Sequence, residues 1–248
     1  MTWSIVARDE RTGHLGVAVA TCAFAVGARV PYLATAVGAI ASQAFVNPFY
    51  GMRGLELMRA GASAEEMIRI VTTADAGRGQ RQVHAMDQAG RIHAYTGADC
   101  VPWCGHLVRD TFSVAGNMLA GLGVIEETAR VFAKGTDLAL AKRFLEALKA
   151  GEAAGGDKRG KQSAAILIHD EEEYALVDIR VDDHVDPLAE LTRLEAASRE
   201  RYAHYRKFMP SRANPAGVID RTEIERLIAA SIATEREAPV SKEAVPTS

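Results

Sequence analysis

The chain has 248 residues, a formal net charge of −3 and a hydrophobic content of 48%, which suits one sizeable domain with or without a small extension. The charge gives no reason to expect nucleic-acid binding, and no apolar run is long enough to cross a bilayer. Because the first residues also lack the basic and apolar segments of a signal peptide, we expect a cytoplasmic protein that binds neither nucleic acid nor membrane.

The first third of the chain predicts two strand pairs. Residues 2–8 and 14–21 alternate between apolar and polar positions, and the turn between them contains Gly13. A second pair spans residues 32–45, with its break at Gly38. Because neither face of this second pair is polar, we expect it to be buried on both sides.

Two helices are predicted next. The first begins at Asn47, a capping residue, with Pro48 at the first helical position. The second begins at Ser63, where Glu66 completes the spacing of a capping box. Both starts carry local signals that fix where a helix begins.

The remaining elements follow in a regular order. Residues 83–96 predict a hairpin, residues 106–117 one or two strands, and residues 163–181 two further strands. Two amphipathic helices lie between the last two groups, and a long helix begins at Asp186 and runs as far as Tyr205. The order strands, two helices, strands, two helices, strands, helix predicts an α+β fold: a four-layer αββα sandwich of two antiparallel sheets flanked by helices.

We expect a domain boundary near residue 210. Residues 1–209 form the sandwich, and residues 210–248 form an extension in which Asp220 and Glu223 begin one more helix. The sequence after about Arg236 is polar and contains prolines, so we expect it to be mobile and dispensable.

Thr2 is the first candidate catalytic residue, because the first predicted strand begins at it. A hydroxyl is a poor nucleophile unless a nearby base takes its proton. An α-amino group has an ordinary pKa of about 7.7–8.0, well below the value of about 10.4 for lysine. If Met1 is removed, Thr2 carries nucleophile and base on one residue, and Thr2 is small enough for that removal.

Long blocks of the chain resemble the DUF1028 group of the N-terminal-nucleophile (Ntn) hydrolase superfamily. They include "TWSIVARDERTGHLGVAVAT", "GAIASQAFVNPFYGMRGLELMRAG", "TGADCVPWCGH", "AGNMLAG", "GGDKRGKQSAAILI" and "DIRVDDHVDPLAELTRL". Together they span about residues 2–205. The resemblance implies the same four-layer sandwich and the reaction class of an amidohydrolase, without naming a substrate.

The resemblance also exposes a departure. Thr2 matches the nucleophile position of the proteasome-like relatives, and "SQAF" lies near the segment where those enzymes offer a backbone N–H to the oxyanion. Those enzymes have an Asp at the end of the second strand and a Lys on the third, whereas the corresponding stretches of this chain read "AVATCA" and "PYLATAV". Lowering the pKa of the amine would then depend on another group, such as Arg29 or Arg159, and hydrolysis of a small amide is favoured over peptidase chemistry.

Asn117 and Gln43 are candidate catalytic residues beside Thr2. Asn117 follows a predicted strand, and its side-chain amide can donate a hydrogen bond to an oxyanion; alternatively it is a turn residue next to Gly116. Gln43 and its neighbour Ser42 end another strand. Either they contact substrate, or they are buried polar groups that satisfy the backbone.

The segment "GGDKRG" predicts a flexible loop that could close over a substrate. It lacks the spacing of a phosphate-binding P-loop. Arg159 could hold a carboxylate by a forked pair of hydrogen bonds, or the loop is simply a solvated hairpin. Candidate substrate-binding residues are therefore Thr21, Ser42, Asp157 and Arg159.

Two clusters raise the question of a metal. The segment "VDDHVDP" contains Asp182, Asp183, His184 and Asp186, residue types that bind divalent metals. Consecutive residues of a strand point in alternate directions and cannot all converge, and Asp186 is better explained as a helix cap. Cys100 and Cys104 lie near His106 but lack a fourth zinc ligand. We expect neither a metal nor a cofactor.

Three functional hypotheses follow. The first is an Ntn amidohydrolase that acts on a small-molecule amide as a homo-oligomer, with Thr2 as nucleophile and its amine as base. The second is a non-catalytic binding or assembly protein of the same fold, which keeps Met1. The third is a metal-dependent hydrolase that uses residues Asp182–Asp186.

Overall fold

Two antiparallel sheets face each other in the computed structural model, which describes residues 2–237. The larger sheet has six strands in the order β10-β9-β2-β1-β8-β7, so β1 lies in its interior. These strands are β1 (Thr2–Arg8), β2 (Leu15–Thr21), β7 (Gly105–Val108), β8 (Phe112–Asn117), β9 (Ser163–His169) and β10 (Val177–Val181).

The smaller sheet has four strands in the order β3-β4-β5-β6. They are β3 (Pro31–Ala34), β4 (Gly38–Ala44), β5 (Arg81–Asp87) and β6 (Ile92–Thr96). The break at Gly38 is confirmed, but the expectation that this pair is buried on both sides is wrong for β3. It is an edge strand, and all four of its residues are partly exposed.

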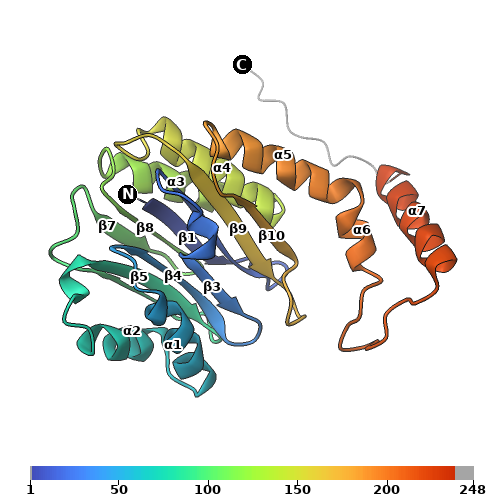
Figure 1. Ribbon diagram of the computed structural model, residues 1–248, viewed down its shortest axis with the longest axis horizontal. Coiled ribbons are helices and arrows are strands. Elements are labelled where there is room, and N and C mark those ends of the chain that lie inside the picture. Colours follow the sequence, from blue (N-terminus) through green and yellow to red (C-terminus); the bar gives the residue numbers. More distant parts are fainter. Residues whose placement is uncertain (1, 238–248) are drawn as a thin grey trace. The chain divides into compact units, whose positions relative to one another are not determined.

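Helix pairs cover the outer face of each sheet (Figure 1). Helices α1 (Pro48–Arg59) and α2 (Ala64–Thr73) pack on the smaller sheet, and α3 (Gly123–Lys134) and α4 (Leu140–Ala153) pack on the larger one. Helix α1 comes very near β3, because a Cβ atom on Gly51 would lie 2.1 Å from the ring of Tyr32. The result is the four-layer αββα sandwich that the element order predicts.

The local start signals of the helices are confirmed. The side chain of Asn47 accepts a hydrogen bond from the amide of Phe49, and Ser63 and Glu66 form a complete capping box. Asp186 accepts a hydrogen bond from the amide of Ala189 and so caps α5 (Pro187–Glu200).

The core between the sheets is made of small and β-branched residues. The buried cluster that fills it contains Val6, Leu15, Val17, Val19, Val26, Val30, Ala39, Ala41, Met86 and Ala165. This apolar core ends toward the Thr2 end of β1, where polar side chains replace it.

The chain divides into two compact units, Met1–Arg193 and Leu194–Ser248. The boundary that we predicted at residue 209/210 stays a prediction. The long helix predicted from Asp186 to Tyr205 is interrupted, because Arg201 has φ −142° and separates α5 from α6 (Tyr202–Arg206).

Within the second unit, α6 is joined to α7 (Arg221–Glu237) by hydrogen bonds. Ser231 accepts from Lys207 and pairs with His204, and Asp220 caps α7 by accepting from Glu223 N at 2.8 Å. Most of the C-terminal segment expected to be mobile lies outside the described residues. No helix in the described part is long and apolar enough to span a membrane.

Candidate active site

Thr2 begins β1, the strand that lies between β2 and β8 in the larger sheet. It is 7% exposed, and its Oγ1 lies 3.1 Å from Oγ1 of Thr21 at the end of β2. On its other side, Thr2 is the register partner of Asn117 at the end of β8. The structure therefore brings together three of the predicted residues, Thr2, Thr21 and Asn117, at one end of three neighbouring strands.

The alternation of side chains along β1 determines which face of the sheet the Thr2 side chain occupies. Successive side chains of a strand point to opposite faces. Ser4 bonds to the smaller sheet and Val6 packs in the core between the sheets, so Thr2 belongs to that same inner face. Trp3 points the other way, toward α4, where a Cβ on Gly151 would lie 2.8 Å from its Nε1.

Gln82, at the start of β5, connects the two sheets beside this end of the larger sheet. Its Oε1 accepts hydrogen bonds from Nε2 of Gln43 at 2.8 Å and Nδ2 of Asn117 at 3.1 Å. Its Nε2 donates to the backbone carbonyl of Gly116 at 2.8 Å and to that of Gly105 at 3.1 Å. The predicted residues Gln43 and Asn117 are thus joined by a residue that the sequence did not single out.

A second missed residue, His84, extends the same polar chain into the core. Its Nε2 lies 2.8 Å from Oγ of Ser4, and its Nδ1 lies 2.7 Å from Oγ of Ser113. Burial, with a smaller contribution from His106, lowers the pKa of His84 to about 3. The imidazole is therefore neutral at ordinary pH.

The backbone is strained at the ends of β4 and β8, the two strands whose side chains bind Gln82. Ala44 directly follows Gln43 and has φ 68°, and Met118 directly follows Asn117 and has φ 55°. Left-handed conformations are uncommon for residues with a side chain, and they cluster at functional sites. The ends of β4 and β8 are thus held in unfavourable conformations on either side of the same glutamine.

The loop that carries Asp157 and Arg159 is tied to the end of β2. The Asp157 carboxylate is buried and accepts from the amide of Cys22, the residue after Thr21, at 2.8 Å. Arg159 pairs with the same carboxylate at 3.2 Å, with 44% of its own side chain exposed. This salt bridge is internal to the loop, so any role of Arg159 toward a substrate carboxylate stays a prediction.

Ser42 is not brought to Thr2. Its hydroxyl donates to the backbone carbonyl of Asn47 at 3.0 Å, at the start of α1. Ser42 lies on the helix-covered face of β4, opposite to the face that carries Gln43. Its role in substrate binding stays a prediction without a geometric link to Thr2.

The Asp-rich segment after β10 is occupied by other contacts. Asp182 pairs with Arg180, Asp183 accepts from Gln162, and Asp186 pairs with Lys161 and caps α5. In the part of the chain that the structure describes, no group of three or more His, Cys, Asp or Glu side chains could hold a metal ion.

The "CVPWC" loop shows two buried or half-buried thiols rather than a ligand set. Cys100 Sγ donates to the carbonyl of Arg81, and Cys104 Sγ donates to the carbonyl of Cys100. Burial raises the pKa of both thiols, and His106 bonds to Thr96 instead. The loop borders the site, because Val101 O accepts from the amide of Met118.

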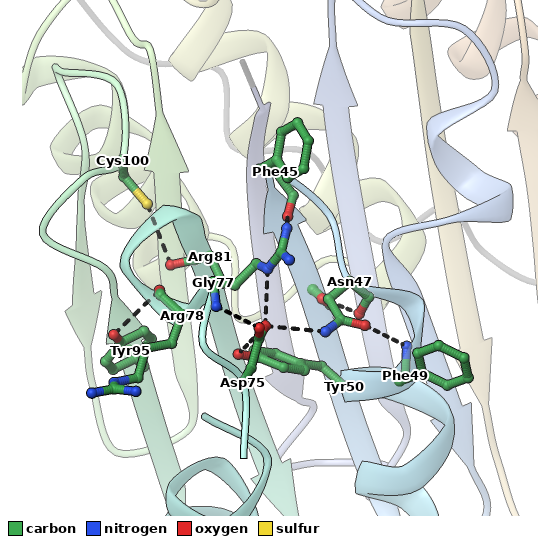
Figure 2. Close-up of polar contacts among 11 residues, drawn as sticks. Phe45, Asn47, Phe49, Tyr50, Asp75, Gly77, Arg78, Arg81, Tyr95 and Cys100 are labelled. Atoms are coloured by element: carbon green, nitrogen blue, oxygen red, sulfur yellow. Dashed lines mark hydrogen bonds and ion pairs between the residues drawn. The ribbon is translucent and has the colours of Figure 1, made fainter. Parts of the chain in front are cut away.

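A second polar centre lies on the helix-covered side of the smaller sheet, just after the end of α2 (Figure 2). The carboxylate of Asp75 accepts from Asn47, Tyr50, Arg81 and the amide of Gly77. Burial by itself would raise the pKa of Asp75, but these donors outweigh it and hold that pKa well below its usual range. Residues of α1 and α2, together with Asn47 and Asp75, line an open pocket of about 510 Å³.

Comparison with known proteins identifies the family. The family model described as "Family of unknown function (DUF1028)" matches residues 2–191. The chain belongs to the DUF1028 family. The crystal structure of protein SPO2555 from Silicibacter pomeroyi, assigned to the same family, is 33% identical, covers 88% of this chain and 99% of its own, and superposes with a TM-score of 0.81.

More distant structures also match this DUF1028 chain. Anbu (ancestral beta-subunit) from Yersinia bercovieri is 10% identical over 84% of this chain and 98% of its own, with a TM-score of 0.37. An Anbu mutant from Hyphomicrobium sp. strain MC1 is 12% identical over 82% of this chain and 97% of its own, with a TM-score of 0.38. The search among curated proteins gives no match.

Proposed function

We propose that this DUF1028 protein is an amidohydrolase that cleaves a small amide with Thr2 as nucleophile and the α-amine of Thr2 as base. One observation carries the proposal: Thr2 begins an interior strand, between Thr21 and Asn117, on the face toward the other sheet. A nucleophile held on a regular strand with buried neighbours is positioned more sharply than one on a loop.

The chemistry follows from the groups on Thr2. After removal of Met1, the free amine takes the proton of Oγ1, and Oγ1 attacks the amide carbonyl. The carbonyl oxygen becomes an oxyanion, and the side-chain amide of Asn117 is the donor proposed to stabilise it. Collapse expels the amine product, which takes the proton from the ammonium group, and leaves an ester on Thr2. The same amine then activates a water molecule that hydrolyses the ester.

The first test is processing of the N-terminus. The mature protein should begin at Thr2, and intact mass should therefore show loss of one methionine. Acetylation of the new amine should abolish activity, because an amide nitrogen cannot accept the proton. Fully active protein that retains Met1 quantitatively would contradict the mechanism.

A non-catalytic binding protein is the alternative. It is favoured by the low exposure of Thr2, whose hydroxyl already pairs with Thr21. Under this alternative Met1 is kept, and replacing Thr2 changes no activity. The cytoplasmic location, the small amide substrate and homo-oligomeric assembly stay predictions in either case.

A further inference from the structure

The side chain of Gln82 is fully buried between the two sheets, near the end of the larger sheet at which Thr2 lies. Two of its acceptors, the carbonyls of Gly105 and Gly116, belong to residues that are register partners in β7 and β8. Backbone carbonyls can only accept hydrogen bonds. The NH₂ end of the Gln82 amide must therefore point at β7 and β8, and its oxygen must point the other way.

That orientation determines which way the side-chain amides of Gln43 and Asn117 point. The oxygen of Gln82 faces Gln43 and Asn117, so each of these side chains must present its NH₂ end to it. For Asn117, one N–H is then used by Gln82. The second N–H and the amide oxygen are fixed in direction by the same hydrogen bond.

The same rule continues to the end of the chain of contacts. With its NH₂ end on Gln82, Gln43 has its oxygen on Ser4, whose hydroxyl donates to it at 2.6 Å. The single proton of Ser4 is thereby used, so Nε2 of His84 must donate to Ser4. The neutral ring then accepts at Nδ1 from Ser113.

This assignment excludes Ser4 and His84 as a catalytic pair, although their separation of 2.8 Å suits one. A general base must accept the proton of the nucleophile, whereas here Nε2 of His84 is the donor and the Ser4 proton goes to Gln43. Both side chains are also fully buried. Donation runs from Ser113 through His84, Ser4 and Gln43 to Oε1 of Gln82, and Asn117 donates to the same oxygen from the other side.

We propose that Gln82 is a positioning residue of the Thr2 site. It holds the amide of Asn117 so that the second N–H of that amide faces the oxyanion formed when Thr2 attacks, and His84, Ser4 and Gln43 keep Gln82 and Asn117 fixed from the core side. The strained residues Ala44 and Met118 support this reading, because each directly follows a residue that binds Gln82. This inference rests on the proposed function of Thr2.

The first experiment is independent of activity. In wild-type protein, the side-chain NH₂ protons of Asn117 should be protected from exchange with solvent, and NMR should show His84 neutral with its proton on Nε2. In Gln82→Met, protection at Asn117 should fall at least tenfold. Thr96→Val removes the hydroxyl that accepts from Nε2 of Gln82 but leaves the contacts of Gln82 with the carbonyls of Gly105 and Gly116. In this variant, protection at Asn117 should stay within twofold of wild type. Unchanged protection in Gln82→Met would overturn the proposal.

The second experiment measures acylation of Thr2 by a short-chain β-lactone, using protein that lacks Met1. Loss of one oxyanion donor, or its displacement by about 1 Å, slows such steps by roughly 10²-fold. Gln82→Met should lower the maximal acylation rate by about this factor and leave the half-saturating concentration unchanged, while Thr96→Val should behave as wild type. A wild-type rate in Gln82→Met would overturn the proposal. If wild-type protein is not acylated at all, the proposed function fails instead, and the exchange measurement alone decides whether Gln82 holds Asn117.

Gln82→Glu keeps the proposal testable if Gln82→Met does not fold. One carboxyl oxygen can accept from Gln43 and Asn117 as before, but the other must carry a proton to donate to the carbonyl of Gly105 or Gly116. Only the neutral acid keeps a donor toward these carbonyls, so the ratio of the variant's acylation rate to the wild-type rate should fall as pH rises. A ratio that does not change between pH 5 and 8 would overturn the proposal.

Discussion

Two consecutive residues of β5 build two different polar centres. Arg81 points to the outer side and binds Asp75, with both side chains 16% exposed, whereas Gln82 points between the sheets and is fully buried. The outer centre uses charge and the inner one uses neutral amides and a neutral imidazole. Burying an unpaired charge costs far more than burying a hydrogen-bonded amide. Charge therefore anchors α1 and β5 where water is near, and directional neutral groups hold Asn117 from the buried side, between the sheets.

The largest expected effect on stability comes from disrupting the inner centre, which consists of Gln82 and the side chains linked to it, Gln43, Asn117, Ser4 and His84. Gln82→Met removes both donor and acceptor and leaves Asn117, Gln43 and two backbone carbonyls with a lost contact. Each buried group left without a partner costs about 1–3 kcal/mol, so we expect the loss of these four contacts to cost about 4 kcal/mol or more. Urea unfolding measures it. Thr96→Val, the matched control, should cost about 1 kcal/mol or less, and equal losses in both variants would show that the Gln82 contacts are not special.

The next effect is the response of the inner centre to acid. The pKa of His84 is about 3 in the folded protein, below its ordinary value of about 6.5. As pH falls below about 6.5, the unfolded chain takes up a proton at His84 and the folded chain does not, so stability falls by about 1.4 kcal/mol per pH unit.

His84→Gln supplies the comparison, because it removes the titrating group. Between pH 7.5 and 5, wild type should lose about 2 kcal/mol more than the variant. Parallel stability curves for the two proteins would mean that His84 takes up a proton in the folded protein as readily as in the unfolded chain, so that its Nδ1 donates to Ser113 instead of accepting from it.

The outer centre should respond less and with a different pH profile. Asp75→Asn replaces a carboxylate that accepts four hydrogen bonds, and we expect a loss of about 1–3 kcal/mol at pH 7. Because the pKa of Asp75 is lowered in the fold, the stabilisation is present above its unfolded value of about 3.9 and is lost as pH falls below it. The difference in melting temperature between wild type and Asp75→Asn should therefore shrink at low pH; a difference that grows would contradict the contacts assigned to Asp75.

The smallest expected effect on stability concerns the strained backbone at Ala44, the last residue of β4. Ala44 has φ 68°, a conformation that costs about 1–2 kcal/mol for residues other than glycine. Ala44→Gly should relieve this cost but add about 0.5–1 kcal/mol of unfolded-state entropy, which leaves a gain of up to about 1.5 kcal/mol. Calorimetry of the single variant measures this gain, and a clear loss would show that the Ala44 methyl group contributes packing.

The sequence predicted those parts of the molecule that depend on local signals. The caps at Asn47, Ser63 and Asp186 and the strand starting at Thr2 involve residues within a few positions of one another. The break at Arg201 escaped prediction, because the apolar spacing continues through it.

The inner centre could not be predicted in the same way. Gln82 and His84 occupy alternate positions of β5, and their partners come from β1, β4 and β8, far away in the sequence. Alternation along the strand puts these polar residues on the same face as Met86, but only the pairing of the strands and the packing of the sheets show that this face is the interior.

The central claim concerns Thr2, and hydrolysis by matched variants tests it most directly. Protein without Met1 is screened against small amides, and the best substrate is then offered to Thr2→Ser and Thr2→Ala after circular dichroism confirms their fold. Thr2→Ser keeps hydroxyl and amine and should retain part of the activity, with a rate that rises through the pKa of the amine. Thr2→Ala should be inactive, and hydrolysis by Thr2→Ala at the wild-type rate would contradict the account.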